Sequence, residues 1–213
     1  MRRPAWRRNV LLRSHRLVLA ANWAPLQPLP RQPASLVRDF ASCNARLWSD
    51  KLGQISLATT TLFWGIGGNM RVIVFPWAAV ALGYNVTQAS SLGAVVAIGT
   101  AGGAVLAALV TKLDKATGTI PMGIAMGLLI AGLNFVNHVW VAVPFLILLG
   151  AVSGYLVVPM NALLQHRGHN LMGAGRSIAV QNFNEQACIL AMGALYSLST
   201  GLGLSAYGSV TAF

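Results

Sequence analysis

The sequence has few charged residues. Only 9% of its 213 residues are Asp, Glu, Lys or Arg, whereas a typical soluble domain has about 25%. The two longest stretches without any of these residues cover positions 72–111 and 116–166. A membrane-spanning helix needs about 20 apolar residues to cross about 30 Å of hydrocarbon, so each stretch is long enough for two crossings and a turn. Together with a mean hydropathy of +0.63, this excludes most soluble folds.

Acidic residues and cysteines are also rare. With four acidic residues in total, an active site built on paired carboxylates is not expected, and neither a G-x-S-x-G motif nor a P-loop occurs. We therefore do not expect an enzyme. The two cysteines have no metal-ligand spacing, and the His166-x-x-His169 pair lacks the further ligands that a zinc site needs. No metal and no cofactor is expected.

Basic residues are abundant and unevenly placed. The net charge is +11, and nine of the fifteen Lys and Arg residues lie in residues 1–46. A basic tail can bind nucleic acid, but basic residues beside spans more often set membrane topology, so no nucleic-acid partner is predicted. Residues 1–46 are also rich in proline, which breaks helices. We interpret them as a disordered leader, with a basic segment on an anionic membrane surface or a displaced gene start as alternatives.

The remaining residues, 47–213, predict an all-α membrane bundle. Five spans are expected, at about 54–82, 88–110, 120–136, 139–163 and 177–198, and the apolar residues 200–213 resemble the beginning of a sixth. The first span should be bent, because it contains a glycine cluster and Pro76. Glycines at GxxxG spacing, such as Gly150 and Gly154, allow another helix to approach closely. A charged loop is expected at 111–115 and a flexible polar loop at 166–176.

Basic residues occur only in alternate gaps between these spans, and therefore on one side of the membrane. The flank before the first span, the gap after the second and the gap after the fourth all contain Lys or Arg, whereas the gaps around Asn85 and His138 contain none. Because positively charged loops stay in the cytosol, the N-terminus and both basic loops are predicted to be cytosolic.

Arg71 is the main candidate for a binding residue. It lies near the middle of the first span, where a charge costs about 2.5–3.5 kcal/mol or more and normally faces a cavity or a partner. One interpretation is a group that binds a phosphate or carboxylate, since the planar guanidinium can donate two hydrogen bonds at once. The other is an internal ion pair that fixes helix packing. Asn69 lies just before Arg71 and is expected at the same site.

The fifth span carries a polar stripe. At about 100° per residue, five of its residues share one face: Ser177, Gln181, Asn184, Glu185 and Cys188. Lipid cannot satisfy such a stripe, so it should face protein or water. It is either the wall of a polar binding cavity, with Gln181, Asn184 and Glu185 in contact with substrate, or an interhelical hydrogen-bond network that holds the bundle together.

Three segments resemble the bacterial lysophospholipid transporters, a family of the major facilitator superfamily. They are QISLATTTLFWG at 54–65, VPMNALLQHRG at 158–168 and GRSIAVQNFNEQ at 175–186. The resemblance covers residues 47–213 and implies the C-terminal six-span half of a twelve-span fold, with its last helix incomplete.

The resemblance implies a function. Such transporters move lysophospholipids, chiefly lysophosphatidylethanolamine, to the cytosolic leaflet of the bacterial inner membrane, where an acyltransferase–synthetase re-acylates them. Arg71 would then meet the lipid phosphate while the acyl chain stays in lipid. Because the N-terminal half is absent, we expect the chain to work only with a separate N-terminal half or with a second copy. The alternatives are a proton-coupled exporter of another amphiphile and a non-transporting membrane protein that docks a partner.

Overall fold

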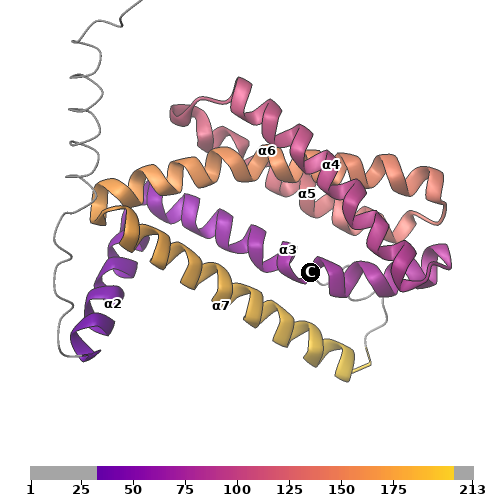
Figure 1. Ribbon diagram of the computed structural model, residues 1–213, viewed down its shortest axis with the longest axis horizontal. Helices are drawn as coiled ribbons and strands as arrows, with labels where there is room; N and C mark the ends of the chain where they lie inside the picture. Colours follow the sequence, from indigo (N-terminus) through magenta and orange to yellow (C-terminus); the bar gives the residue numbers. More distant parts are fainter. Residues whose placement is uncertain (1–32, 204–213) are drawn as a thin grey trace, which may run out of the picture. The chain divides into compact units, whose positions relative to one another are not determined.

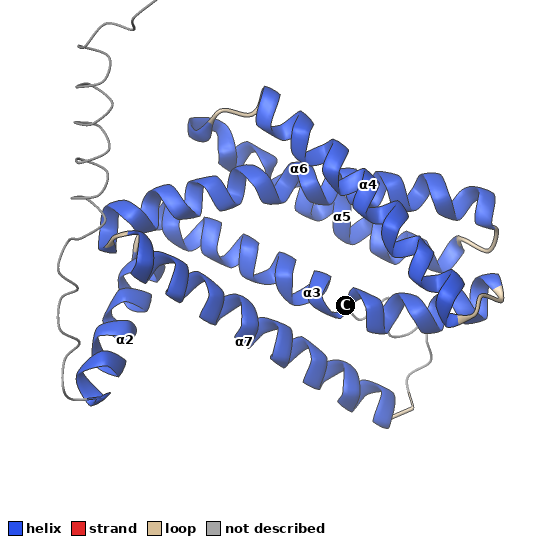
Figure 2. Ribbon diagram, in the orientation of Figure 1, coloured by secondary structure: helices blue, strands red, loops and turns tan. Residues whose placement is uncertain are grey.

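The structure is a computed structural model that describes residues 33–203, apart from the side chains of residues 71–73. Every regular element within 33–203 is a helix (Figure 2). The chain divides into two units, Met1–Asp39 and Phe40–Phe213. The predicted all-α membrane helix bundle is confirmed, and the packing described below is that of the second unit.

Helix α2 covers Pro33–Ser49, within the segment that was predicted to be disordered up to residue 46. Pro33 is the first residue of the helix, a position where its missing N–H costs nothing and its fixed φ suits the helix. Beyond Asp39, one face of α2 carries Cys43 and Leu47, which are buried against Leu57, Leu164 and Val180. The described part of the predicted leader is therefore helical. Residues 1–32 lie outside the described residues.

Helix α3 covers Lys51–Leu82 and is bent, as predicted. Asp50 caps its first turn, because the carboxylate accepts a hydrogen bond of 2.8 Å from the Gly53 amide. The segments Lys51–Met70 and Val74–Leu82 meet at 49°. Pro76 explains the bend, since it cannot donate to the carbonyl four residues earlier. The helix ends at Gly83, whose φ of 66° is a left-handed conformation that glycine adopts without strain.

The next two apolar segments form α4 and α5. Helix α4, Val86–Val110, begins with a capping box in which Asn85 and Gln88 bond reciprocally. The predicted charged loop at 111–115 is mostly the first part of a 3₁₀ helix, η1, Leu113–Thr119. Helix α5 covers Ile120–Gly132 and continues as a short 3₁₀ helix, η2, Leu133–Phe135.

The bounds of helices α6 and α7 show that the prediction of a flexible loop between them was wrong. Helix α6 covers Val139–Met172 and α7 covers Ala174–Gly201, so Gly173 alone separates them. The predicted flexible loop at 166–176 is thus almost entirely helical. The reason is length: 34 residues span about 51 Å, far more than the about 30 Å of hydrocarbon. The polar end of α6 can therefore stay helical outside the apolar layer.

Helix α3 lies between α7 on one side and α4, α5 and α6 on the other (Figure 1). The closest packing joins α4 and α6. A Cβ added at Gly103 would overlap the backbone of Ala151, and one added at Gly154 would overlap the backbone of Thr100. Gly99 and Gly150 approach the facing backbone in the same way. The predicted close approach at Gly150 and Gly154 is confirmed.

Three helical segments of the described chain are long and apolar enough to cross a membrane, or four if bent α3 counts as one span. They are Val86–Val110, Leu113–Phe135 and Val139–Met172. The chain is thus a multi-pass membrane protein. Helix α7 has 28 residues, enough to span the hydrocarbon, but its polar stripe lowers its hydropathy. The total of five spans stays a prediction.

Candidate functional site

The polar stripe of α7 faces the interior of the protein. Ser177 is 1% exposed, and Gln181 and Glu185 are each 8% exposed, whereas Asn182 and Gln186 lie on the exposed side of the same helix. A buried amide or carboxylate is costly unless it is hydrogen-bonded. The partners of these side chains therefore decide what the stripe does.

Gln181 joins α7 to α6. Its Nε2 donates to the Asn161 Oδ1 at 2.9 Å and to the Glu185 Oε1 at 2.8 Å. One amide group thus satisfies an acceptor on the neighbouring helix and a buried carboxylate one turn away. This brings together two of the predicted site residues, Gln181 and Glu185.

Asn184 joins α7 to α2. Its Nδ2 donates to the Asn44 Oδ1 at 2.8 Å and to the Val180 carbonyl at 2.8 Å, and its Oδ1 accepts from the Trp48 indole at 3.3 Å. We refer to Asn44, Trp48, Asn161, Gln181, Asn184 and Glu185 together as the polar network. It links α2, α6 and α7, an arrangement that matches the interhelical interpretation of the stripe.

Asn69 lies outside the polar network but also contacts α7. Its Nδ2 donates to the Gly65 carbonyl at 2.8 Å and to the Ile189 carbonyl at 3.0 Å. The predicted residue is therefore buried between α3 and α7 and uses its amide to join them. Arg71 is part of α3, but its side chain lies outside the described residues.

A bidentate ion pair lies where α3 begins and α6 is near its end. The Arg167 Nη2 and Nε donate to the two carboxylate oxygens of Asp50, at 2.5 and 2.9 Å. The hydrogen bond from Arg167 lowers the pKa of Asp50, and desolvation opposes this shift. Asp50 thus serves two roles, because the same carboxylate caps α3 and holds Arg167. Paired parallel hydrogen bonds of this kind are stronger and more directional than a single contact.

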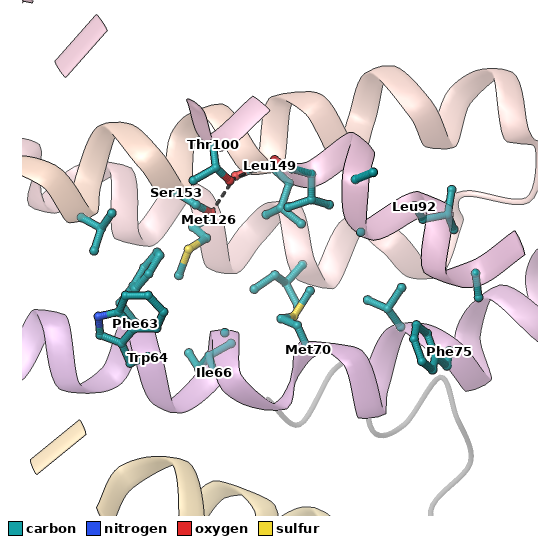
Figure 3. A pocket seen from close by; sticks show the side chains of 18 of the residues that line it. Phe63, Trp64, Ile66, Met70, Phe75, Leu92, Thr100, Met126, Leu149 and Ser153 are labelled. Carbon is teal, nitrogen blue, oxygen red and sulfur yellow. Dashed lines mark hydrogen bonds between the residues drawn. The ribbon is translucent and has the colours of Figure 1, made fainter. Parts of the chain in front are cut away.

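An apolar groove lies on the other side of α3 from α7. It has a volume of about 830 Å³ and is lined by residues of α3, α4, α5 and α6. Phe63 and Trp64 lie at one end, Phe75 at the other, and Met70 and Met126 between them (Figure 3). Of the predicted site residues whose side chains the structure describes, Asn69, Gln181, Asn184 and Glu185, none lines this groove. Helix α3 therefore separates two different environments, a polar contact with α7 and an apolar cavity.

No group of three or more His, Cys, Asp or Glu side chains in residues 33–203 could hold a metal ion. His166 and His169 lie on the exposed end of α6, and His166 is 3.3 Å from the Asn170 amide nitrogen. Cys43 and Cys188 are free thiols.

Sequence reasoning missed four partners of the site: Asn44, Trp48, Asp50 and Asn161. Asn44 was assigned to the leader, Trp48 and Asp50 to the flank of the first span, and Asn161 to the fourth span. A signal was present, since Phe40, Cys43 and Leu47 recur at the spacing of one helix face. Asn44 and Trp48 are likewise four residues apart. The prolines before residue 34 favoured a disordered leader, so this amphipathic pattern was overlooked.

The helical membrane architecture and the buried polar stripe define a multi-pass membrane protein with a polar interior, a feature of membrane transport proteins. Sequence comparison shows which proteins the chain is similar to. The chain is 39% identical over 178 residues to the lysophospholipid transporter LplT of Pectobacterium carotovorum, 39% identical over 184 residues to that of Salmonella arizonae, and 40% identical over 174 residues to that of Yersinia pestis. These matches cover 83%, 85% and 81% of the chain.

The chain is therefore a relative of the lysophospholipid transporters, and the resemblance seen in its sequence motifs is confirmed. The three matches cover 44%, 46% and 43% of those transporters, so the chain spans less than half of the length of the curated relatives. No protein-family model and no solved structure matches the chain. The major facilitator fold and the position as a C-terminal half stay predictions.

Proposed function

We propose that the chain forms part of a lysophospholipid transporter that moves lysophosphatidylethanolamine-type lipids to the cytosolic leaflet of the bacterial inner membrane. There, a cytosolic acyltransferase–synthetase would re-acylate them. The observation that carries this proposal is the identity of 39–40% with transporters of that name over more than four fifths of the chain. Those relatives are named as transporters and not as enzymes, and the scarcity of acidic residues agrees with a role without catalysis.

Arg71 is the proposed phosphate-binding group. It follows Asn69 on α3, the helix that lies between the polar stripe and the apolar groove. A lysophospholipid needs both environments, because its headgroup is charged and its tail is hydrocarbon. Asn69, Gln181, Asn184 and Glu185 are the proposed polar wall beside the headgroup. The described hydrogen bonds of Asn69, Gln181 and Asn184 join helices, and Glu185 accepts from Gln181. Their main contribution would therefore be to hold α7 in place, with direct headgroup contact as a second role.

The rest of the transport path would come from outside the matched region. The relatives are more than twice as long as the part that this chain matches, and binding sites in transporters built from two repeats lie between the repeats. We propose that a complete path needs a second half, supplied by an N-terminal domain or by another copy. Transport of labelled lysolipid by vesicles that contain only this purified chain would contradict this part of the proposal.

The function is tested by headgroup-dependent binding. The purified chain is titrated with lysophosphatidylethanolamine and with monoacylglycerol of the same acyl chain, which has no phosphate. Arg71→Ala should weaken lysophosphatidylethanolamine binding by about tenfold or more, because a hydrogen bond to a charged group contributes about 1.5–3 kcal/mol. It should leave monoacylglycerol binding unchanged, and Arg71→Lys should keep part of the affinity. Equal losses for both lipids would contradict phosphate recognition and favour another amphiphile as substrate.

A further inference from the structure

The apolar groove has the length of one acyl chain. Its lining follows α3 from Phe63 to Phe75, which corresponds to about 18 Å of helix axis. One leaflet of a bilayer is half of a hydrocarbon layer about 30 Å thick, so a lipid tail and this groove are of similar length. The volume of about 830 Å³ is within the range of about 300–1,000 Å³ that is usual for ligand pockets.

The groove offers nothing to a polar ligand along most of its wall. None of the described residues that line it is charged; the side chains of residues 71–73 are outside the described part of α3. Its three hydroxyl side chains donate to carbonyls of their own helices: Ser90 to Val86 at 2.8 Å, Thr100 to Val96 at 2.9 Å and Ser153 to Leu149 at 2.7 Å. Because these hydroxyl donors are already satisfied, this part of the wall suits hydrocarbon.

Two glycines keep the groove open. Gly67 of α3 and Gly93 of α4 both line it, and a Cβ added at either position would meet no atom within 4 Å. This distinguishes them from Gly99 and Gly103, whose missing side chains allow α6 to pack against α4. At Gly67 and Gly93 the missing side chain leaves space inside the groove.

We propose that this groove binds the single acyl chain of the lysophospholipid, an inference that rests on the proposed function. The tail would then lie among α3, α4, α5 and α6, and not in bulk lipid, which is where the family resemblance would leave it. Bulk lipid is as apolar as the groove, so binding here depends on shape and close packing. A lysolipid brings one tail to a groove about one tail long, whereas a diacyl lipid brings two. We therefore expect lysolipids to bind here more tightly than diacyl lipids.

The test uses a lysophosphatidylethanolamine with a photoreactive diazirine near the end of its acyl chain. The full chain is purified in detergent and illuminated with this probe, and labelled peptides are mapped by mass spectrometry. We expect labels on the groove residues of α3 and α5, among them Met70 and Met126. Excess unlabelled lysolipid should compete for this labelling, and diacyl phosphatidylethanolamine should compete poorly.

Three matched variants complete the test. Gly67→Leu and Gly93→Leu fill the groove and should lower labelling of Met70 and Met126 by about fivefold or more, as expected for a loss of about 1 kcal/mol. Gly127→Leu is the control, because Gly127 is exposed, has no atom within 4 Å of an added Cβ and does not line the groove. It should leave labelling unchanged. Far-ultraviolet circular dichroism and size-exclusion chromatography show whether each variant is folded.

Two results would overturn the proposal, and they are distinguishable. Labels confined to exposed apolar side chains such as Leu109, Leu128 and Leu190, with no decrease in Gly67→Leu or Gly93→Leu, would show that the tail stays in lipid while the headgroup is still bound. That result contradicts the groove alone. An absence of saturable lysolipid binding by the unsubstituted chain would contradict the proposed function and the groove together.

Discussion

At the scale of single residues, Asp50 has the clearest double role, because it caps α3 and pairs with Arg167. Asp50→Ala removes both contacts and should lower the free energy of unfolding by about 0.5–2 kcal/mol through the lost cap alone. Asp50→Asn keeps a side chain that caps well, so it should be less harmful. Unfolding in mixed detergent and sodium dodecyl sulfate would measure the difference. Equal losses in the two variants would contradict a capping role.

The same carboxylate should make stability depend on pH. Arg167 lowers the pKa of Asp50 below its ordinary value of 3.8, and a group whose pKa is lowered on folding stabilises the protein while it is ionised. The contribution is therefore complete above about pH 4 and is lost as the pH falls through the lower pKa of the folded state. Melting temperatures from pH 3 to 6 should fall more steeply on the acid side for the unsubstituted chain than for Asp50→Asn.

Gly168 and Ser177 form a second residue pair that can be tested. A Cβ added at Gly168 would overlap the side chain of Ser177, whose buried hydroxyl has no hydrogen-bond partner among the residues that the structure describes. Gly168→Ala should lower the free energy of unfolding by about 1–3 kcal/mol. Adding Ser177→Gly should recover most of this loss, because it removes the atoms that collide. A double-mutant cycle measures the coupling, and additive effects would contradict the contact.

At the scale of helices, the packing of α4 on α6 depends on which glycine faces the partner. Gly103→Ala would push a methyl group into the Ala151 backbone, whereas its neighbour Gly102 has open space. Gly103→Ala should cost about 1–3 kcal/mol or more. Gly102→Ala should instead stabilise by up to about 1 kcal/mol, since alanine is the better helix former. Melting temperatures of the two variants provide the comparison, and a similar change in both would contradict this packing.

The helices also show what could be predicted from the sequence. The ends of α3 and α4 lie close to the ends of the predicted spans, because a long apolar run indicates the segment that crosses the hydrocarbon. The inward stripe on α7 was predictable for the same reason. The helical end of α6 was missed, because residues 166–170 are mostly polar and polarity alone does not distinguish a loop from a helix that leaves the membrane. The groove could not be predicted, since it needs four helices to be placed together in space.

At the scale of the whole molecule, the orientation and the number of spans can be tested together. The charge pattern predicts that Lys112 and His169 face the cytosol, whereas Thr87 and His138 face the periplasm. Thr200 near the end of α7 is periplasmic only if α7 crosses. Single cysteines are introduced at these exposed positions in a background with Cys43→Ala and Cys188→Ala.

A membrane-impermeant maleimide applied to intact spheroplasts should label Thr87→Cys, His138→Cys and Thr200→Cys, and should reach Lys112→Cys and His169→Cys only after permeabilisation.

Whether α7 crosses depends on whether its packing offsets the free-energy cost of placing its polar stripe in the membrane. Gln181, Asn184 and Glu185 would each be costly in lipid, but in the folded protein each is hydrogen-bonded to another side chain. We therefore expect α7 to cross as part of the bundle. Labelling of Thr200→Cys only after permeabilisation would show that it does not, and residues 33–203 would then contain four spans.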